Sequence, residues 1–148
     1  MTTYAMGYQN ADIHGIAAFE SLDIFTQTQL VAGAEPALTP AVRILLADSL
    51  TLANFTVVGL DAAGKLVKAA YNAIVASGVV PIGVLVHAAT SGAANATIKG
   101  EVWLTGCFNA DADSPLVWDA SFDTLAKKTT WAGIVGLPGL LFRSRAAV

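Results

Sequence analysis

The chain has 148 residues, of which 55% are hydrophobic and only 13% charged, with a formal net charge of −3 at pH 7. This length is sufficient for one domain with a sizeable core. The charged fraction is about half of the ~25% found in typical soluble domains, so little charged surface is available to keep a monomer dispersed. The composition therefore favours a homo-oligomer or a component of a larger assembly. The acidic balance argues against nucleic-acid binding, which usually requires a basic patch.

The single cysteine, Cys107, excludes an intramolecular disulfide framework, and its apolar neighbours predict a buried, unreactive thiol. The first residues lack a basic segment followed by an apolar run, so no signal peptide is expected. Residues 69–98 contain no Asp, Glu, Lys or Arg, but Pro81 and Gly83 interrupt them and Val and Ile are frequent. These residues therefore predict buried sheet, and no membrane partner.

Residues 1–36 predict an extended N-terminal arm that precedes a domain formed by residues 37–148. Aromatic and aliphatic side chains are spread through the arm without a helical or alternating period, between Gly, Asn and Gln. Such a segment packs poorly on its own but carries anchors for a surface, so we expect it to become ordered on a partner. The alternative is an irregular segment packed on its own domain.

The first predicted strand of the domain covers residues 42–47. Their sequence, VRILLA, also fits a helix with Thr39 as its N-cap. The alternating residues that follow, at 50–58, are typical of β-structure and favour the strand.

Residues 55–69 (FTVVGLDAAGKLVKA) predict a hairpin with Gly64 in its turn. Gly59, Gly64 and Lys65 also match most of a phosphate-binding loop. That motif ends in a Ser or Thr whose hydroxyl holds magnesium, but Leu66 occupies this position, and strand-like residues follow where a helix is required. The sequence therefore favours the hairpin.

Residues 79–109 predict two central strands, an apolar run and then an alternating run, joined by a small polar loop. Alternation puts Gly100 and Val102 on one face of the second strand and Glu101 and Trp103 on the other. A tryptophan among polar neighbours indicates either packing at the rim of the domain or a contact between subunits.

Residues 109–114 (NADADS) predict an acidic turn, and residues 130–142 are again apolar, with Pro138 and Gly139 marking a turn. Asp111 and Asp113 are spaced like the start of a calcium loop. Because the glycine and the closing glutamate of that motif are missing, a solvated turn is expected.

A short helix is predicted within residues 115–128. Asp119 or Ser121 is expected to cap it, and Phe122 and Leu125 are expected to face inward.

No catalytic or metal-binding motif is present. His14 and His87 have no cysteine, histidine or carboxylate at ligand spacing, and no nucleophile elbow occurs. In its apolar strand, His87 is expected to be a core or interface residue. The sequence predicts neither an enzyme nor a cofactor.

Several motifs, taken in order, resemble the lambda-type phage head decoration proteins. Those proteins show a strand, a return strand, a spacer, an apolar strand, a strand that closes on an aromatic residue, a short helix and a basic turn into a final strand. The resemblance covers residues 36–142. Its motifs are LDAAGKLVKA (60–69), PIGVLVHAA (81–89), GEVWLTGCFN (100–109), LVW (116–118) and KKTTWAG (127–133).

The resemblance implies a mixed α/β, β-rich fold with a small barrel-like β core, a short helix and an extended N-terminal arm. It implies a homotrimer that binds the major capsid protein at three-fold positions of the expanded head and reinforces the head against internal DNA pressure. The protein would then be found on the exterior of the capsid, and in the host cytoplasm during assembly. The arm would order on the capsid shell.

On this reading, we assign the contacts to the aromatic and apolar side chains of the arm and to the three tryptophans, as a hypothesis that no family motif supplies. In the arm, capsid binding is expected of Tyr4, Met6, Tyr8, Ile13, Ile16 and Phe19. Trimer packing or a place in the core is expected of Trp103, Trp118 and Trp131.

Two other functions compete with the decoration protein. One is a trimeric tail, fibre or spike component built on a similar β domain. The other is a small-molecule-binding or hydrolytic β-barrel enzyme, which needs a concave pocket with converging polar groups that the sequence does not indicate.

Overall fold

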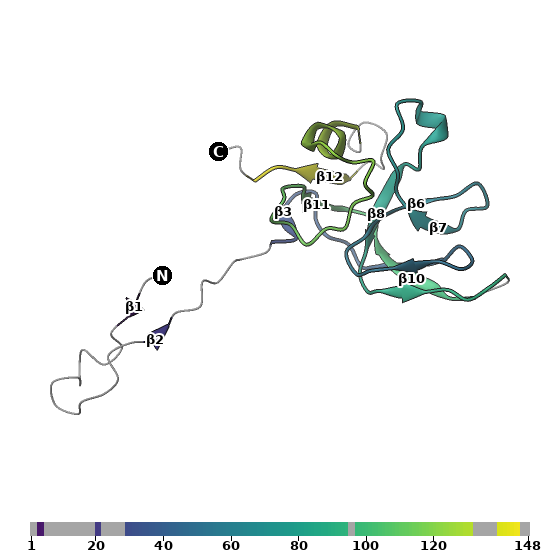
Figure 1. Cartoon of the computed structure of the whole chain (residues 1–148), viewed down its shortest axis with the longest axis horizontal. Helices are drawn as coiled ribbons and strands as arrows, with labels where there is room; N and C mark the ends of the chain where they lie inside the picture. Colours follow the sequence, from purple (N-terminus) through teal and green to yellow (C-terminus); the bar gives the residue numbers. More distant parts are fainter. Residues whose placement is uncertain (1–2, 5–19, 22–28, 95–96, 132–138, 146–148) are drawn as a thin grey trace.

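The computed structural model describes residues 3–4, 20–21, 29–94, 97–131 and 139–145 (Figure 1). These residues form many short strands in several sheets and little helix, which confirms the predicted β-rich character. The strands are β1 (Thr3–Tyr4), β2 (Glu20–Ser21), β3 (Val31–Gly33), β4 (Val42–Leu45), β5 (Thr51–Leu52), β6 (Val57–Leu60), β7 (Leu66–Lys68), β8 (Pro81–Leu85), β9 (Ala89–Thr90), β10 (Lys99–Trp103), β11 (Gly106–Asn109) and β12 (Leu140–Arg143). The helices are the 3₁₀-helix η1 (Val75–Ser77) and the π-helix η2 (Lys127–Trp131).

The largest sheet has five strands in the order β4-β10-β8-β6-β7, and every neighbouring pair is antiparallel. β4 confirms the strand predicted over residues 42–47. β6 and β7 form the predicted hairpin, in which Leu60 pairs with Leu66. Both assignments rest on local alternation, which the structure preserves.

The five-stranded sheet curls until its two edges approach each other. At an isolated parallel bridge between Leu46 and Leu66, the Ala47 N–H donates to the Leu66 carbonyl at 3.0 Å. β4 and β7 are otherwise not neighbours in the described sheets, and none of these sheets closes into a barrel. The expected barrel-like core is therefore an open, curled sheet in the part of the chain that the structure describes.

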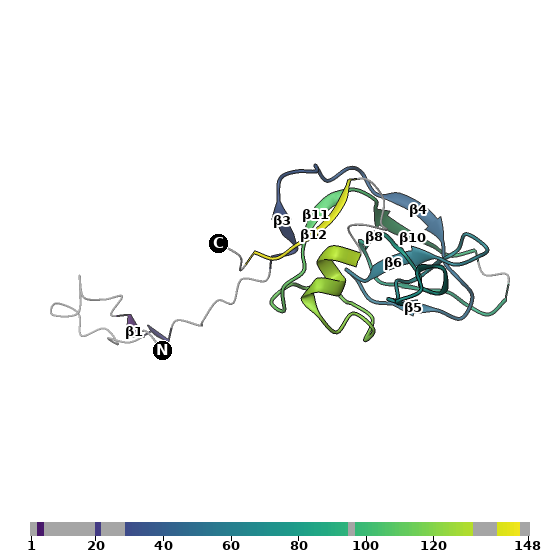
Figure 2. The ribbon, with the colours of Figure 1, turned by 90° about the horizontal axis from the view of Figure 1, so that it is seen from above.

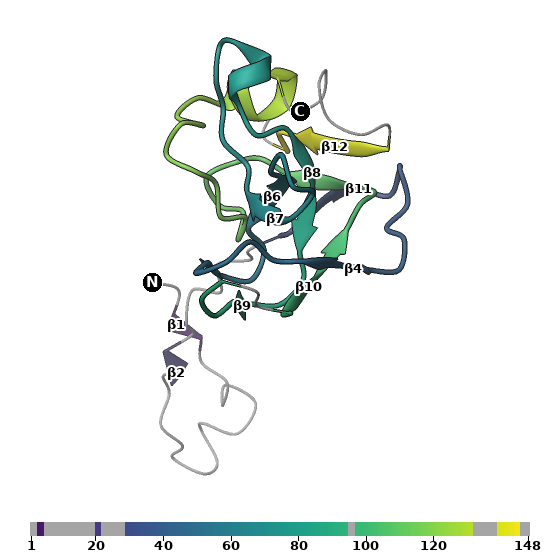
Figure 3. The ribbon, with the colours of Figure 1, turned by 90° about the vertical axis from the view of Figure 1, so that its right-hand side faces the viewer.

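A second sheet, β12-β11-β3, lies beside the first (Figures 2 and 3). β11 runs parallel to β12 and antiparallel to β3. β3 falls within residues 1–36, so the end of the segment assigned to the arm pairs with the body. The short run Val31–Gly33 carries little local strand signal, and the free edge of β11 supplies its partner.

The four remaining strands form two smaller two-stranded sheets. β5 pairs with β9, and β1 pairs with β2 through Thr3 with Ser21 and Tyr4 with Glu20. In Figures 1 and 2, β1 and β2 lie apart from the other strands, on the β3 side of the molecule.

The central strands separate two clusters of buried side chains. On β8, Val84 enters the first cluster and the next residue, Leu85, enters the second; on β6, Val57 and Val58 are divided in the same way. Strands that are buried on both faces have nearly continuous apolar sequences, which explains the apolar run at residues 79–86. The first cluster lies between the two sheets and contains Val57, Ala69, Val84, Phe108, Ala110, Leu116, Phe122, Leu140 and Phe142. The second fills the curl of the five-stranded sheet with Leu46, Leu52, Val58, Leu66, Leu85 and Val102.

β8 passes very close to β10 at Gly83. A Cβ atom at this position would lie 2.3 Å from the carbonyl oxygen of Trp103. Only glycine allows the two backbones to approach this closely.

The predicted second central strand is divided in two. β10 belongs to the five-stranded sheet, whereas β11 belongs to the three-stranded sheet. The chain changes direction at Gly106, whose φ of 147° is rare for residues with a side chain. The expected alternation holds in β10, since Gly100 and Val102 are buried and Glu101 and Trp103 are partly exposed.

The predicted short helix starts later than expected. Leu125 and Ala126 are α-helical and lead into η2, so the helix begins at Leu125. The Thr124 hydroxyl, 3.3 Å from the Lys127 N–H, takes the capping role expected of Asp119 or Ser121. Phe122 is buried as predicted. Leu125 is 44% exposed, so its predicted inward orientation is wrong. The late start moves it to the outer side of the helix.

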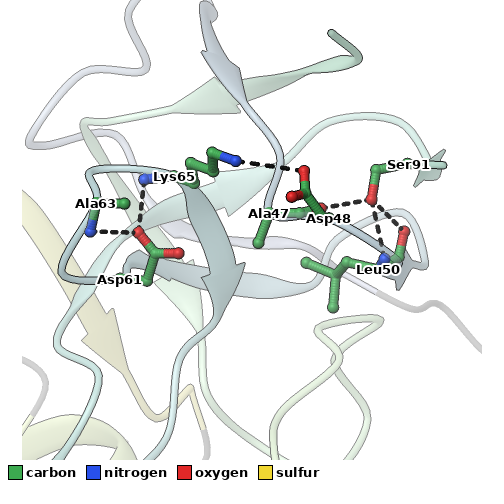
Figure 4. Close-up of polar contacts among 7 residues, drawn as sticks. All are labelled: Ala47, Asp48, Leu50, Asp61, Ala63, Lys65 and Ser91. Carbon is green, nitrogen blue, oxygen red and sulfur yellow. Dashed lines mark hydrogen bonds and ion pairs between the residues drawn. The ribbon is translucent and has the colours of Figure 1, made fainter. Parts of the chain in front are cut away.

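The Ser91 side chain links its own loop to the loop at residues 47–50 by hydrogen bonds (Figure 4). Its buried hydroxyl donates to the Ala47 carbonyl at 2.5 Å and accepts from the Leu50 N–H at 2.9 Å.

Replacing Ser91 by alanine leaves these two groups without partners, so we expect the free energy of unfolding to fall by about 1–3 kcal/mol. Urea denaturation measures this change. Ser77→Ala, on the exposed surface of η1, is the control and should have almost no effect; an equal loss in both variants would contradict the role of the buried hydroxyl.

Candidate functional site

The turn that resembles a phosphate-binding loop is occupied by its own carboxylate. Asp61 Oδ1 accepts hydrogen bonds from the N–H groups of Ala63 at 2.9 Å and Lys65 at 2.8 Å (Figure 4). The Lys65 ammonium lies 3.3 Å from Asp48 Oδ1. The N–H groups that would hold a phosphate therefore face a negative charge, and this turn is the end of a hairpin.

The carboxylates of the acidic turn accept hydrogen bonds from other groups of the protein. Asp111 accepts from the Ser144 hydroxyl and from the Arg145 N–H, both at 2.6 Å. Asp113 accepts from the Asn109 side-chain amide at 3.2 Å. Among the described residues, no group of three or more His, Cys, Asp or Glu side chains is placed to hold a metal ion.

Asn109 anchors the point where the arm joins the body. It is fully buried, its N–H donates to the Leu30 carbonyl at 2.9 Å, and its side-chain amide donates to the Gln29 carbonyl at 3.0 Å. Since Asp111 holds residues 144–145, the start of the body and its C-terminal strand are fastened to the same turn. The sequence gives no local signal for these contacts, because Asn109 and Gln29 are eighty positions apart.

Of the three residues considered for reactive chemistry, Cys107 and His87 are described by the structure and His14 lies outside the described residues. Cys107 is buried, as predicted. His87 is exposed at the end of β8, so the core placement predicted for it is wrong. The last hydrogen bond between these strands runs from the Val86 N–H to the Glu101 carbonyl at 2.8 Å, and beyond it β8 and β10 separate, which leaves His87 at the surface. The interface alternative for His87 stays a prediction.

Trp103 packs on the first cluster from β10. Its ring is stacked on Phe55 with a centroid distance of 6.4 Å and an interplanar angle of 8°, and it lies 6.3 Å from Phe108. It is only partly buried, so one side of the residue remains available to another chain.

Trp118 and Trp131 pack on the same cluster beside η2. The Trp118 ring lies 4.8 Å from that of Phe142, and the Trp131 ring lies 5.2 Å from that of Tyr71. Their buried indole N–H groups have no acceptor among the described residues. All three predicted tryptophans thus contact the core cluster, and a part in subunit packing stays a prediction. Two lysine ammonium groups lie over aromatic rings next to them, Lys127 over Tyr71 and Lys128 over Trp118.

The carboxyl group of Asp119, in the turn before η2, makes the stability of the domain depend on pH. Hydrogen bonds from the N–H and hydroxyl of Ser121 lower the pKa of Asp119 below its usual value of 3.8. Because the folded-state pKa lies below that of the unfolded chain, the ionised carboxylate stabilises the fold above the unfolded pKa. This contribution is lost as the pH falls through the folded-state pKa.

Replacing Asp119 by alanine should therefore reduce the loss of stability on acidification. We expect the free energy of unfolding to fall less in Asp119→Ala than in the parent between about pH 6 and about pH 2.5. Urea titrations at the two pH values measure this difference. Asp119→Asn keeps the accepting oxygen without titrating and should also show the smaller fall. A fall equal to that of the parent in both variants would contradict the assignment.

Large apolar side chains are exposed at several places on the body. Ile74 is 67% exposed at the start of the η1 turn, and others lie on or beside β3, β4, β6 and η2. The set comprises Val31, Leu38, Val42, Leu60, Ile74, Val75, Ile98 and Leu125. These residues are candidates for contact with other chains.

A groove of about 460 Å³ lies where β8 and β10 separate. Its charged or titratable side chains are Arg43, His87, Lys99 and Glu101. Arg43 pairs with Glu101 at 2.9 Å. The side chains of His87 and Lys99 make no hydrogen bond or ion pair within the described residues. The groove thus contains two cationic side chains, one of which is paired with a carboxylate.

The predicted capsid-binding residues fall almost entirely outside the described residues. Tyr4 is placed by its backbone in β1. Met6, Tyr8, Ile13, Ile16 and Phe19 lie outside the described ranges.

No protein-family model matches the chain, and no curated protein matches it in sequence. Among the described residues, neither helix has the length and apolar character of a membrane span.

Proposed function

We propose that this protein is a trimeric capsid decoration protein of a bacteriophage. It binds the expanded head at three-fold positions through its N-terminal arm and stabilises the head against internal DNA pressure. The finer features of the fold, an N-terminal arm that orders on the capsid and a β core like that of the decoration proteins, belong to this proposal.

The order of the structural elements carries the proposal. The β6–β7 hairpin is followed by a spacer with η1, then β8, β10 and β11, the short helix η2 and the last strand β12. This order parallels the succession of motifs for which the sequence resembles the lambda-type decoration proteins, with two differences: β9 lies between β8 and β10, and the basic motif forms the helix instead of a turn after it. The LVW motif lies before η2, and Lys127–Trp131 of the KKTTWAG motif forms it.

The surface of the body is consistent with an assembly component. Single exposed apolar residues are ordinary in monomers. Here they accompany a charged fraction of only 13%, so more of the surface is suited to burial between chains. The body offers apolar positions for subunit contacts, while the arm remains available for the capsid.

The proposed mechanism is thermodynamic. A ligand that binds one state of a particle and not another stabilises the first state by mass action. A trimer presents three arms to the lattice, and linked binding sites raise the overall affinity without any new contact. Many decorated sites would therefore stabilise the expanded head together.

Light scattering followed by capsid binding tests the proposal. The purified chain should have the mass of a trimer, and it should sediment with expanded heads that lack decoration protein, assembled from the major capsid protein of the same virus. A monomer that does not bind these heads would overturn the proposed function.

A further inference from the structure

A small pocket lies beside η2, between this helix and the start of the connection from β7 to β8. Its volume is about 330 Å³, and it is lined by Tyr71, Ala126, Lys127, Thr130 and Trp131. Ligand pockets in proteins measure about 300–1,000 Å³, so this one is of a size for a single small ring. The decoration function proposed above makes no use of it.

Two aromatic rings supply the apolar surface of the pocket. The Tyr71 and Trp131 ring centroids are 5.2 Å apart, with an angle of 69° between the rings, and each ring meets the Phe122 ring at 64°. No pair in this group is stacked face to face, and Tyr71 and Trp131 are only partly buried, so aromatic surface is open to the pocket. The face of such a ring carries negative charge density and attracts weakly positive C–H groups.

Polar groups of both kinds border this aromatic surface. The Lys127 ammonium lies 2.6 Å from Asp123 Oδ1 and 4.7 Å from the centroid of the Tyr71 ring. This ion pair has no net charge, yet the ammonium keeps further donors and the carboxylate further acceptors. Thr130 is exposed, and its hydroxyl makes no hydrogen bond within the described residues. Donors and acceptors are therefore both available around the rings.

This combination favours a neutral ring that carries hydroxyl groups. An anionic ligand would meet Asp123 and a cationic one would meet Lys127, and neither would gain from a pair that is already neutral. A purely apolar ligand would leave the polar groups of the border without partners. A pyranose sugar has a face of C–H groups and a rim of hydroxyls that donate and accept. It matches both the aromatic surface and its polar border.

We propose that the Tyr71–Trp131 pocket binds a single pyranose ring of a neutral glycan. The C–H face of the sugar lies on the two aromatic side chains, and its hydroxyls bond to Lys127, Asp123 and Thr130. This inference goes beyond the proposed function and requires only the folded body. A ligand of this size is expected to bind with a Kd of about 1–10 mM.

Saturation-transfer NMR with the full-length protein tests the site. The probes are the methyl glycosides of glucose, galactose and mannose, together with N-acetylglucosamine, each titrated to about 50 mM. At least one of them should give a saturable signal that is strongest at the C–H protons of the ring. Glucuronate and glucosamine carry a charge on a similar ring and should bind no more tightly than the neutral sugars.

Two substitutions locate the binding site. Ala126→Leu, at an exposed position in the wall of the pocket, fills the space and should abolish the signal. Thr130→Val removes one hydroxyl and should weaken binding roughly fivefold. The matched controls are Ala62→Leu in the β6–β7 turn and Thr51→Val on β5, which are exposed and do not line the pocket. Both controls should bind as the parent does.

The outcomes separate this inference from the proposed function. It would be overturned by the absence of a saturable signal with all four neutral sugars, by an unchanged signal in Ala126→Leu, by equal affinities of Thr130→Val and Thr51→Val, or by tighter binding of either charged sugar. None of these measurements uses capsids, and Ala126→Leu should still co-sediment with expanded heads. A parent protein that binds the sugar but not the heads would overturn only the proposed function.

Discussion

Deletion of residues 2–20 is expected to abolish binding to expanded capsids while leaving the trimer intact. The deleted segment holds all six predicted capsid-binding residues, whereas the body retains both sheets and both buried clusters. In the proposed trimer three linked arms bind the head together, so deletion of all three should lower the apparent affinity by more than about 100-fold, below what co-sedimentation detects. Co-sedimentation with undecorated heads measures binding, and light scattering measures the mass.

A double substitution tests whether capsid binding requires the apolar side chains of the arm and not only its length. Ile13→Ser with Ile16→Ser keeps every residue position but removes two apolar anchors, so it should weaken binding to heads without changing the mass of the trimer. Undiminished binding by the deletion variant would show that the body carries the capsid contact. A monomeric deletion variant would place the arm in the subunit interface.

Replacement of Phe108 by alanine is expected to cost about 3–5 kcal/mol, the range for large aromatic residues in cores. Phe108 is fully buried between the two sheets, with its ring 6.3 Å from that of Trp103 and 6.0 Å from that of Phe142. Since small domains have only about 5–15 kcal/mol of stability in total, this variant should unfold at much lower urea concentration.

Two controls show whether the volume of Phe108 is the cause. Phe108→Leu keeps most of the apolar volume and should lose about 1 kcal/mol. Leu60→Ala, at a position that is 40% exposed, should change the stability by less than about 0.5 kcal/mol. Similar urea midpoints for the parent and Phe108→Ala would contradict the central place of this residue in the core.

The parts of the fold that depend on neighbouring residues could be predicted from the sequence. The hairpin follows from two β-prone runs around Gly64, and the structure pairs β6 with β7 at this turn. Leu66 and the strand-like residues after it argued against a phosphate site, and the Asp61 carboxylate indeed occupies the turn. In these places the local pattern and the tertiary structure agree.

The parts that depend on distant residues could not be predicted. β3 exists because β11 offers a free edge, and no property of Val31–Gly33 alone indicates this pairing. The exposure of His87 results from the separation of β8 from β10, which an apolar sequence does not reveal. Likewise, the groove brings Arg43 together with Lys99 through strand pairing across more than fifty residues.

The burial of β6 and β8 on both faces has a consequence for how the chain finds its strand register. A one-residue slip normally exposes apolar side chains to water, and this cost fixes the register. In β8, a slip would only exchange residues such as Val84 and Leu85 between two apolar compartments. The alignment must then come from shape, and Gly83 provides it, because any other residue there would meet the Trp103 carbonyl at 2.3 Å. The absence of a side chain at Gly83 thus fixes the register of β8, whereas in most sheets the alternation of polar and apolar side chains fixes it.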